Sequence, residues 1–248
     1  MKLGVIAIAA ASLFLSQAVS AAEIKVLASG AIKEAYLELI PQFEKASEHK
    51  VVTTWAGTVD IKKRMAAGEV FDLVVVASPE LDAFIKEGKL VPGSRTDLVR
   101  SGIGVAVRAG APKPDIGSGE ALKRALLAAK SIGYSTGPSG VYLASLFERM
   151  GIADQIKPKL KQTQPGVLVG SIIANGEAEI GFQQVSELIH VPGIDFLGPL
   201  PADVQKITVF SAGIHSGAKE SEAAKALVKF LTAPAAAPVF KKHGLEPG

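Results

Sequence analysis

The sequence predicts an α/β fold, in which strands alternate with helices and helices cover both faces of a sheet. Two observations carry this prediction. Short stretches rich in β-branched residues alternate with longer stretches of helical periodicity along most of the chain. In addition, the run "FDLVVV" at residues 71–76 is almost continuously apolar, which is typical of a strand buried on both faces.

The first part of the chain contains three predicted strand–helix pairs. The strands are expected at residues 24–28, 51–56 and 71–76. The helices are expected at residues 31–46 and 59–67, and from Pro79 to the glycine at residue 88. Pro41 lies inside the first helix and is expected to kink or split it, because proline lacks the N–H that an interior position needs.

The second part continues the alternation. Strands are expected in "SGIGVAVRAG", at residues 131–134, in "EAEIGFQQ" and in "KITVFSAGI", and helices at residues 167–174, 220–231 and 234–242. Between the strand at 131–134 and a helix that starts near Val141 lies "STGPSG", residues 135–140. This stretch is either a turn in which Ser139 caps the helix or part of an anion site, because the first N–H groups of a helix have no internal partner.

The N-terminus has the features of a secretory signal peptide at residues 1–22. A positive start is followed by an apolar stretch and by small residues suited to cleavage after Ala21 or Ala22, and an uncleaved anchor is the alternative. The chain contains no cysteine, so it has no disulfide and no site for a lipid anchor. We therefore expect a soluble, monomeric protein in the periplasm, with free secretion as the alternative.

Composition and motifs argue against several functional classes. The formal net charge is only +3, which does not indicate a nucleic-acid partner. The four histidines are scattered and no metal-binding, nucleophile or dinucleotide motif is present in full. We therefore expect no catalytic activity, no cofactor and no metal.

Small polar residues stand directly between a strand and a helix at four places. They are Ser29–Gly30, Gly57–Thr58, Ala77–Ser78 and the stretch 135–140. Ligands in open α/β sheets collect outside the carboxyl ends of the strands. Several helix N-termini aimed at one crevice would form a neutral cage of N–H and O–H donors, suited to a compact oxyanion. The alternative is ordinary helix capping by Ser, Thr and Gly.

Several stretches, in order, resemble a known family. They include "IKVLASGAIKEAYLELIPQFEKAS", "AAGEVFDLVVVAS", "GPSGVYLASLFERMG", "IIANGEAEIGFQQVSEL" and "FLTAPAAAPVFKKHG". Across nearly all of the mature chain the sequence is similar to the periplasmic molybdate-binding proteins of ABC transporters. The resemblance implies the type II periplasmic binding fold: two lobes, each a mixed sheet flanked by helices, with a ligand cleft between them. It also implies an inner-membrane permease as partner.

The resemblance also implies a set of ligand groups. The family's first hydroxyl falls on Ala31, and the nearest hydroxyl here is Ser29, followed by Gly30. The second hydroxyl falls on Thr58. The third group is a backbone N–H at Ser139, beside Gly140.

The remaining two groups differ in how well they match. The fourth is a backbone N–H around Gly166 or Val167. The fifth is a tyrosine hydroxyl in the family, and here its position holds Gln184, beside Gln183. Because the chain departs from the pattern at this position, the ligand is either a molybdate-like oxyanion or another anion such as sulfate, phosphate or a small organic acid. A periplasmic enzyme or sensor domain on the same fold is the third alternative.

The chain is expected to pass between the lobes near residues 100–102 and again near residues 205–208. Lobe 1 would then comprise residues 23–100 plus 209–248, and lobe 2 residues 101–208. The lobes would close on the ligand by a hinge.

Overall fold

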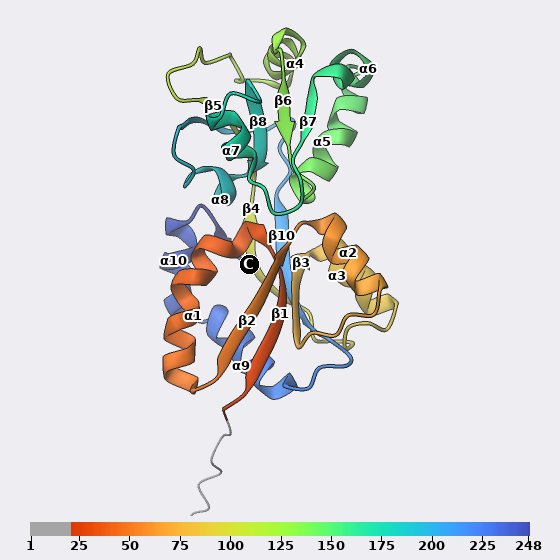
Figure 1. The fold of residues 1–248 in the computed structure, drawn as a ribbon, viewed down its shortest axis with the longest axis vertical. Coiled ribbons are helices and arrows are strands. Elements are labelled where there is room, and N and C mark those ends of the chain that lie inside the picture. Colours follow the sequence, from red (N-terminus) through yellow and green to blue (C-terminus); the bar gives the residue numbers. More distant parts are fainter. Residues whose placement is uncertain (1–20) are drawn as a thin grey trace, which may run out of the picture.

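The computed structural model describes residues 21–248, so the predicted signal peptide lies almost entirely outside the described residues. Two mixed sheets are stacked along the long axis of the molecule, and helices cover both faces of each sheet (Figure 1). We call the part built on the larger sheet lobe 1 and the part built on the smaller sheet lobe 2. The predicted α/β fold with two lobes is confirmed.

The sheet of lobe 1 has six strands in the order β11-β4-β10-β3-β1-β2. β1 pairs in parallel with β2 and β3, whereas β10 pairs antiparallel with β3 and β4. The bounds of the strands are β1 Glu23–Ser29, β2 Lys50–Ala56, β3 Leu73–Ala77, β4 Thr96–Ser101, β10 Thr208–Ile214 and β11 Glu246–Pro247.

The sheet of lobe 2 has five strands in the order β7-β6-β8-β5-β9. β6 pairs in parallel with β7 and β8, and β5 pairs antiparallel with β8 and β9. The bounds of the strands are β5 Ile103–Arg108, β6 Ile132–Tyr134, β7 Leu160–Gln162, β8 Ile180–Gln184 and β9 Ile194–Pro199.

The helices fill the connections between strands. In lobe 1 they are η1 Gly30–Ile32, α1 Lys33–Ser47, α2 Thr58–Ala66, α3 Ser78–Lys86, α9 Ser221–Leu231, η3 Pro234–Ala236 and α10 Ala237–Lys242. In lobe 2 they are α4 Gly119–Ala128, α5 Pro138–Arg149, α6 Ala153–Ile156, η2 Lys157–Lys159, α7 Val169–Ala174 and α8 Val185–Leu188. Within residues 21–248 no single helix is long and apolar enough to span a membrane; only the bent pair Ser221–Leu231 and Pro234–Lys242 passes that test jointly.

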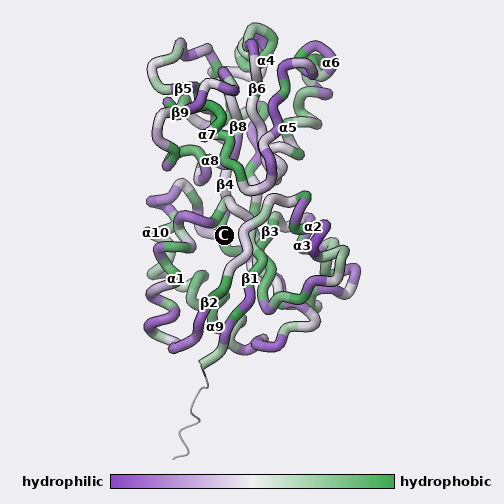
Figure 2. The backbone as a smooth tube through the Cα atoms, in the orientation of Figure 1, coloured by the Kyte–Doolittle hydropathy of each residue, from purple (hydrophilic) through white to green (hydrophobic). Residues whose placement is uncertain are grey.

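Each lobe has its own hydrophobic core on both sides of its sheet. All five residues of β3 are buried, as the apolar run at residues 71–76 predicts. Figure 2 shows this strand in hydrophobic colours at the centre of lobe 1, whereas the outer helices alternate between hydrophobic and hydrophilic residues. Burial of these faces from water is the main force that holds each lobe together.

The chain passes from one sheet to the other at two places. Only Gly102 separates β4 from β5, and the return runs from the end of β9 to the start of β10. Gln205 ties the two passages together, because its amide accepts a hydrogen bond from the N–H of Ile103 at 2.9 Å and donates to the Ile103 carbonyl at 3.0 Å. The predicted lobe boundaries, 23–100 plus 209–248 and 101–208, lie near these passages, and the behaviour of the lobes as moving units stays a prediction.

Two local expectations were contradicted, the first in part. Pro41 was expected to kink or split the first helix; it does not split it, since α1 runs from Lys33 to Ser47. Pro41 lies on the solvent side of α1, where water can hydrogen-bond the carbonyl that proline leaves without a donor. Ser139 does not cap α5, because the N-cap is Gly137 and Ser139 lies inside the first helical turn.

Candidate functional site

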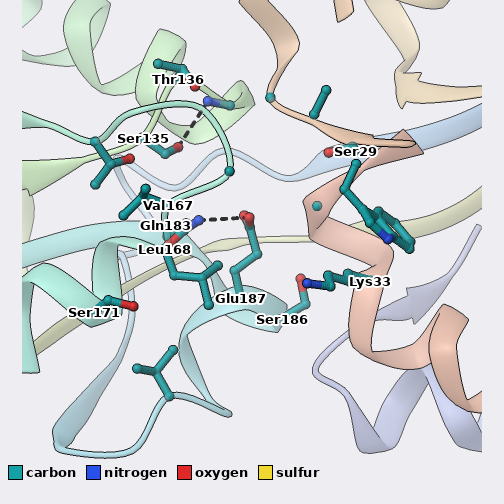
Figure 3. Close-up of a pocket in the computed structure, with 18 of the residues that line it drawn as sticks. Ser29, Lys33, Ser135, Thr136, Val167, Leu168, Ser171, Gln183, Ser186 and Glu187 are labelled. Atoms are coloured by element: carbon teal, nitrogen blue, oxygen red, sulfur yellow. Dashed lines mark hydrogen bonds between the residues drawn. The ribbon is translucent and has the colours of Figure 1, made fainter. Parts of the chain in front are cut away.

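A cleft of about 570 Å³ lies between the two lobes. Lobe 1 contributes the ends of β1 and β2 and the start of α1, and lobe 2 contributes the turn before α5, the loop before α7 and the residues around α8 (Figure 3). Part of the lining comes from Ser29, Gly30, Lys33, Trp55, Gly57, Ser135, Thr136, Thr163, Val167, Gln183, Glu187 and His190. Side chains from both lobes can therefore touch the same ligand.

The wall from lobe 1 combines a backbone turn with one cation. Ser29 ends β1, and its hydroxyl accepts a hydrogen bond from the N–H of Ala31 at 3.4 Å. Lys33 opens α1 and extends toward the cleft (Figure 3). Trp55 both lines the cleft and packs edge-on against Tyr36, with ring centroids 5.3 Å apart. This wall offers one positive charge, from Lys33, and an aromatic surface, with the acidic residue Glu34 beside them in the lining.

The wall from lobe 2 begins with the turn before α5. The hydroxyl of Ser135 accepts a hydrogen bond from the N–H of Gly137 at 3.1 Å and lies 3.2 Å from the hydroxyl of Ser139. Ser135 and Thr136 line the cleft, whereas Ser139 is fully buried behind them and is absent from the lining.

Gly140 also lies behind the cleft wall. A β-carbon added there would stand only 1.7 Å from the carbonyl oxygen of Ser135. The glycine is therefore required by the close approach of the chain to itself, and a contact between Gly140 and a ligand stays a prediction.

A glutamine and a glutamate form the polar centre of the cleft. The side-chain oxygen of Gln183 accepts a hydrogen bond from the N–H of Val169 at 2.7 Å, which fixes the orientation of the amide. The amide nitrogen of Gln183 then donates to the carboxyl group of Glu187 at 2.8 Å (Figure 3). Gln183 is 3% exposed and Glu187 is half-buried. The carboxyl group is thus held in a fixed position on the lobe 2 side of the cleft.

Glu187 also faces lobe 1. Its carboxyl oxygen lies 3.3 Å from the position that a β-carbon on Gly30 would occupy, so any side chain at residue 30 would crowd it. Next to it, the hydroxyl of Ser186 donates to the carbonyl of Ala31 at 2.7 Å. Burial raises the pKa of Glu187 to about 7, against the lowering effect of the hydrogen bonds from Gln183 and from the backbone of Gln184. The group therefore changes its charge close to neutral pH.

Gln184 points away from the cleft. Gln184 is fully buried. In the amide orientation that gives both the oxygen and the nitrogen a hydrogen-bond partner, the nitrogen donates to the carbonyl oxygens of Ser101 and Gly102 at 3.2 and 3.1 Å. The resemblance places the fifth ligand group at Gln184, but Gln183 is the glutamine that lines the cleft. Gln184 instead links β8 to the passage between the lobes.

Two buried hydroxyl groups have no hydrogen-bond partner among the described residues. They belong to Thr58 at the start of α2 and to Thr163 after β7. Thr163 lines the cleft and is 6% exposed, whereas Thr58 is absent from the lining. A buried hydroxyl without a partner is costly, so Thr163 is well suited to hydrogen-bond a ligand oxygen.

Of the residues expected to bind ligand, three line the cleft: Ser29, Gly30 and Val167. The other four lie behind its walls: Thr58, Ser139, Gly140 and Gln184. Whether any of them contacts a ligand stays a prediction.

Comparison with known proteins adds three findings. Residues 24–246 match the model of the family described as bacterial extracellular solute-binding protein. This chain belongs to that family. It is 38% identical over 253 residues to a Pseudomonas sp. protein named aconitate isomerase, an alignment that covers 100% of this chain and 95% of the relative. It is 28% identical over 245 residues to the molybdate-binding protein ModA of Azotobacter vinelandii, covering 93% of this chain and 92% of that protein.

A solved structure supports the fold of this solute-binding protein. The periplasmic molybdate-binding protein of Azotobacter vinelandii aligns with a TM-score of 0.75 at 19% identity, covering 91% of this chain and 99% of that chain. At that level of identity the likeness concerns the fold, and the resemblance to molybdate-binding proteins is confirmed at the level of family and fold.

The sequence analysis missed the acidic and basic residues of the cleft in this family member. Lys33, Glu34, Glu187 and His190 were not singled out as ligand groups, although all four line the cleft. A usable signal existed for Glu187, because it lies in the first turn after a strand end, where ligands collect in α/β folds. For Lys33, Glu34 and His190, no local pattern distinguishes them from surface residues.

Proposed function

We propose that this protein binds a small organic polycarboxylate of the aconitate type in the cleft and interconverts its isomers by proton transfer. The observation that carries the proposal is Glu187, a carboxyl group in the cleft whose pKa is raised to about 7 and which Gln183 holds in place at 2.8 Å. A general base works best when its pKa is near the working pH. The relative named aconitate isomerase, 38% identical over the whole chain, supports the same choice.

The chemistry requires only the movement of a proton and of a double bond. In an unsaturated polycarboxylate the ionised Glu187 would take a proton from the methylene carbon beside the double bond. The electron pair left on that carbon shifts the double bond by one position, and a proton is added to the carbon at the far end. No electrons are gained or lost, and each proton removed is replaced by one.

The size and polarity of the cleft suit such a substrate. A volume of about 570 Å³ falls within the range of roughly 300–1,000 Å³ that is usual for organic ligands. Lys33 supplies a positive charge for one carboxylate, and the unpartnered hydroxyl of Thr163 supplies a donor from the opposite lobe. A ligand with several carboxylates could therefore engage both lobes at once.

This proposal departs from the expectation of a protein without catalytic activity. That expectation rested on motifs that are readable in the sequence, and a lone glutamate after a strand is not one of them. The periplasmic location expected from residues 1–22 remains part of the proposal.

A second candidate is the capture of a small oxyanion for an ABC importer, with an inner-membrane permease as partner. The observation that favours it is the backbone turn before α5, where small residues and hydroxyls line the cleft at the start of a twelve-residue helix. The relative ModA from Azotobacter vinelandii is named a molybdate-binding protein, which supports this candidate at lower identity.

One experiment separates the two candidates. The purified protein is mixed with trans-aconitate or cis-aconitate, and conversion is followed by proton NMR. In parallel, calorimetry measures binding of both isomers, molybdate and sulfate. We expect conversion of both isomers by the wild type and a loss of about a hundredfold or more in Glu187→Gln, which should still bind both isomers.

Glu148→Gln is the matched control, because Glu148 lies on the exposed face of α5. It should leave conversion unchanged. Binding of molybdate without any conversion of aconitate would refute the isomerase proposal and support the importer. Equal conversion by wild type and Glu187→Gln would show that Glu187 is not the base.

A further inference from the structure

His190 is a second titratable group in the same cleft. It follows Glu187 by three residues, and both side chains line the cleft. α8 ends at Leu188, so His190 lies in the turn that follows the helix, where it is exposed. Because both residues line one cleft, a substrate bound in that cleft can contact both.

A hydrogen-bonded chain holds His190 from lobe 1. The Nε2 atom of His190 lies 3.0 Å from Nδ1 of His243, and Nε2 of His243 lies 2.8 Å from a carboxyl oxygen of Glu38. The same oxygen accepts a hydrogen bond from Lys242 at 2.8 Å. Since His190 belongs to lobe 2 and the other three residues to lobe 1, the chain is complete only when the lobes are together.

This chain determines which ring nitrogen of His190 is free. Lys242 and His243 hold the pKa of Glu38 below its usual range, so the carboxylate is ionised and can only accept hydrogen bonds. His243 must then donate from Nε2, and in its neutral form it accepts at Nδ1. His190 therefore donates from Nε2, and its Nδ1 keeps a lone pair that has no hydrogen-bond partner within residues 21–248.

The surroundings shift the pKa values of His190 and Glu187 in opposite directions. Partial burial lowers the pKa of His190, helped by the charges of His243 and Lys242 and opposed by Glu34. Burial raises the pKa of Glu187 to about 7. Near neutral pH, His190 is thus mainly a neutral base while a large fraction of Glu187 still carries a proton.

We propose that His190 is the second proton-transfer group of the cleft, acting together with Glu187, and that His243 and Glu38 position it by fixing its tautomer. This inference rests on the proposed isomerase function. Glu187 is the base in one direction of the isomerisation. In the other direction, Nδ1 of His190 takes the proton from the methylene carbon of the substrate, and the double bond shifts. Protonated Glu187 then gives its proton to the far carbon. Solvent restores the starting state, because the imidazolium loses one proton and the carboxylate gains one.

The test follows the isomerisation of trans-aconitate in heavy water. In the wild type, the added hydrogen comes from a group that exchanges with solvent, so we expect deuterium in the product. His190→Gln keeps an N–H donor toward His243 but removes the basic lone pair. We expect its rate to fall about a hundredfold or more, and its residual product to retain protium, since Glu187 alone would remove and return the same proton.

Two further variants complete the test. His215→Asn is the control, because His215 lies outside the cleft and its Nδ1 only accepts from the N–H of Gly217, a role that asparagine can fill. It should turn over at the wild-type rate. His243→Phe removes the positioning contact, so we expect a lower kcat with little change in KM and a shift of the His190 ring-nitrogen signals in ¹⁵N NMR.

The outcomes distinguish this inference from the function on which it rests. A wild type that neither isomerises aconitate nor exchanges its methylene hydrogens contradicts both proposals. Turnover by His190→Gln within twofold of wild type, or a wild-type product that keeps the substrate's own proton, contradicts only the role of His190.

Discussion

Replacing Gln183 by methionine should raise the pKa of Glu187 further. The amide nitrogen of Gln183 donates to the carboxyl group at 2.8 Å and so favours its ionised form. A hydrogen bond to a charged group contributes about 1.5–3 kcal/mol. At 1.36 kcal/mol per pKa unit, its loss corresponds to a rise of roughly one to two units from the value of about 7.

The sign of the effect on activity follows directly. In the direction in which Glu187 is the base, it acts only when ionised, so the rate in that direction increases as pH rises through its pKa. In Gln183→Met this rise in rate should occur at higher pH. At pH 7 the ionised fraction of Glu187 should fall from about one half to about one tenth or less. The assay is a ¹³C NMR titration of the Glu187 carboxyl group, which needs no turnover, combined with the pH profile of kcat/KM.

Gln184→Met is the matched control for this experiment. Gln184 is the adjacent residue, it is fully buried, and it also loses amide hydrogen bonds in the variant, but its partners are Thr208 and the backbone between the lobes. Both variants should lose stability, because each leaves buried polar groups unpaired. Only Gln183→Met should shift the pKa of Glu187. An unchanged pKa in that variant, or an equal shift in Gln184→Met, would refute the reasoning.

Two further predictions concern glycines near the cleft. Gly140→Ala should abolish folding or lower the melting temperature strongly in thermal unfolding, because its β-carbon would overlap the carbonyl of Ser135 at 1.7 Å. Gly137→Ala, which meets only the hydroxyl of Ser135 at 3.3 Å, should fold normally, and equal melting temperatures for the two variants would contradict the argument. Gly57→Ala should keep the lobes apart, because its β-carbon would lie 2.7 Å from the hydroxyl oxygen of Thr136 in the other lobe. Small-angle scattering should show a larger radius of gyration for Gly57→Ala than for the wild type. The double variant Gly57→Ala/Thr136→Ala should return to the wild-type radius. A wild-type radius for Gly57→Ala alone would be evidence against a direct contact between the lobes at this point.

Much of the fold could be predicted from local patterns. The buried run at residues 71–76 became β3, and glycine and small polar residues marked the ends of the early strands and helices. Asp60 lies in the first turn of α2, where the helix dipole favours a carboxylate, and it also hydrogen-bonds Arg64 at 3.1 Å. The strands β4 and β9 and the helix α4 were not predicted. For α4 the signal was present, because Ser118 caps the helix and the buried Leu122 and Leu126 lie four residues apart.

The centre of the site could not be predicted in the same way. Alternation along β8 places Ile180, Phe182 and Gln184 on one face and Gly181 and Gln183 on the other. Both faces are buried, so polarity does not indicate which glutamine points toward the cleft. The choice depends on the packing of α7 behind Gly181, where a β-carbon would meet Ile173 and Val169 at 2.7 Å.

The position of Glu187 also separates the two candidate functions through the direction of their pH dependence. Below its pKa of about 7 the carboxyl group is neutral and can donate a hydrogen bond to an oxyanion; above it, the carboxylate repels any anion in the cleft. Capture of a dianion such as molybdate should therefore weaken as pH rises from 6 to 8. Proton abstraction by Glu187 should strengthen over the same range, because the ionised base becomes more abundant.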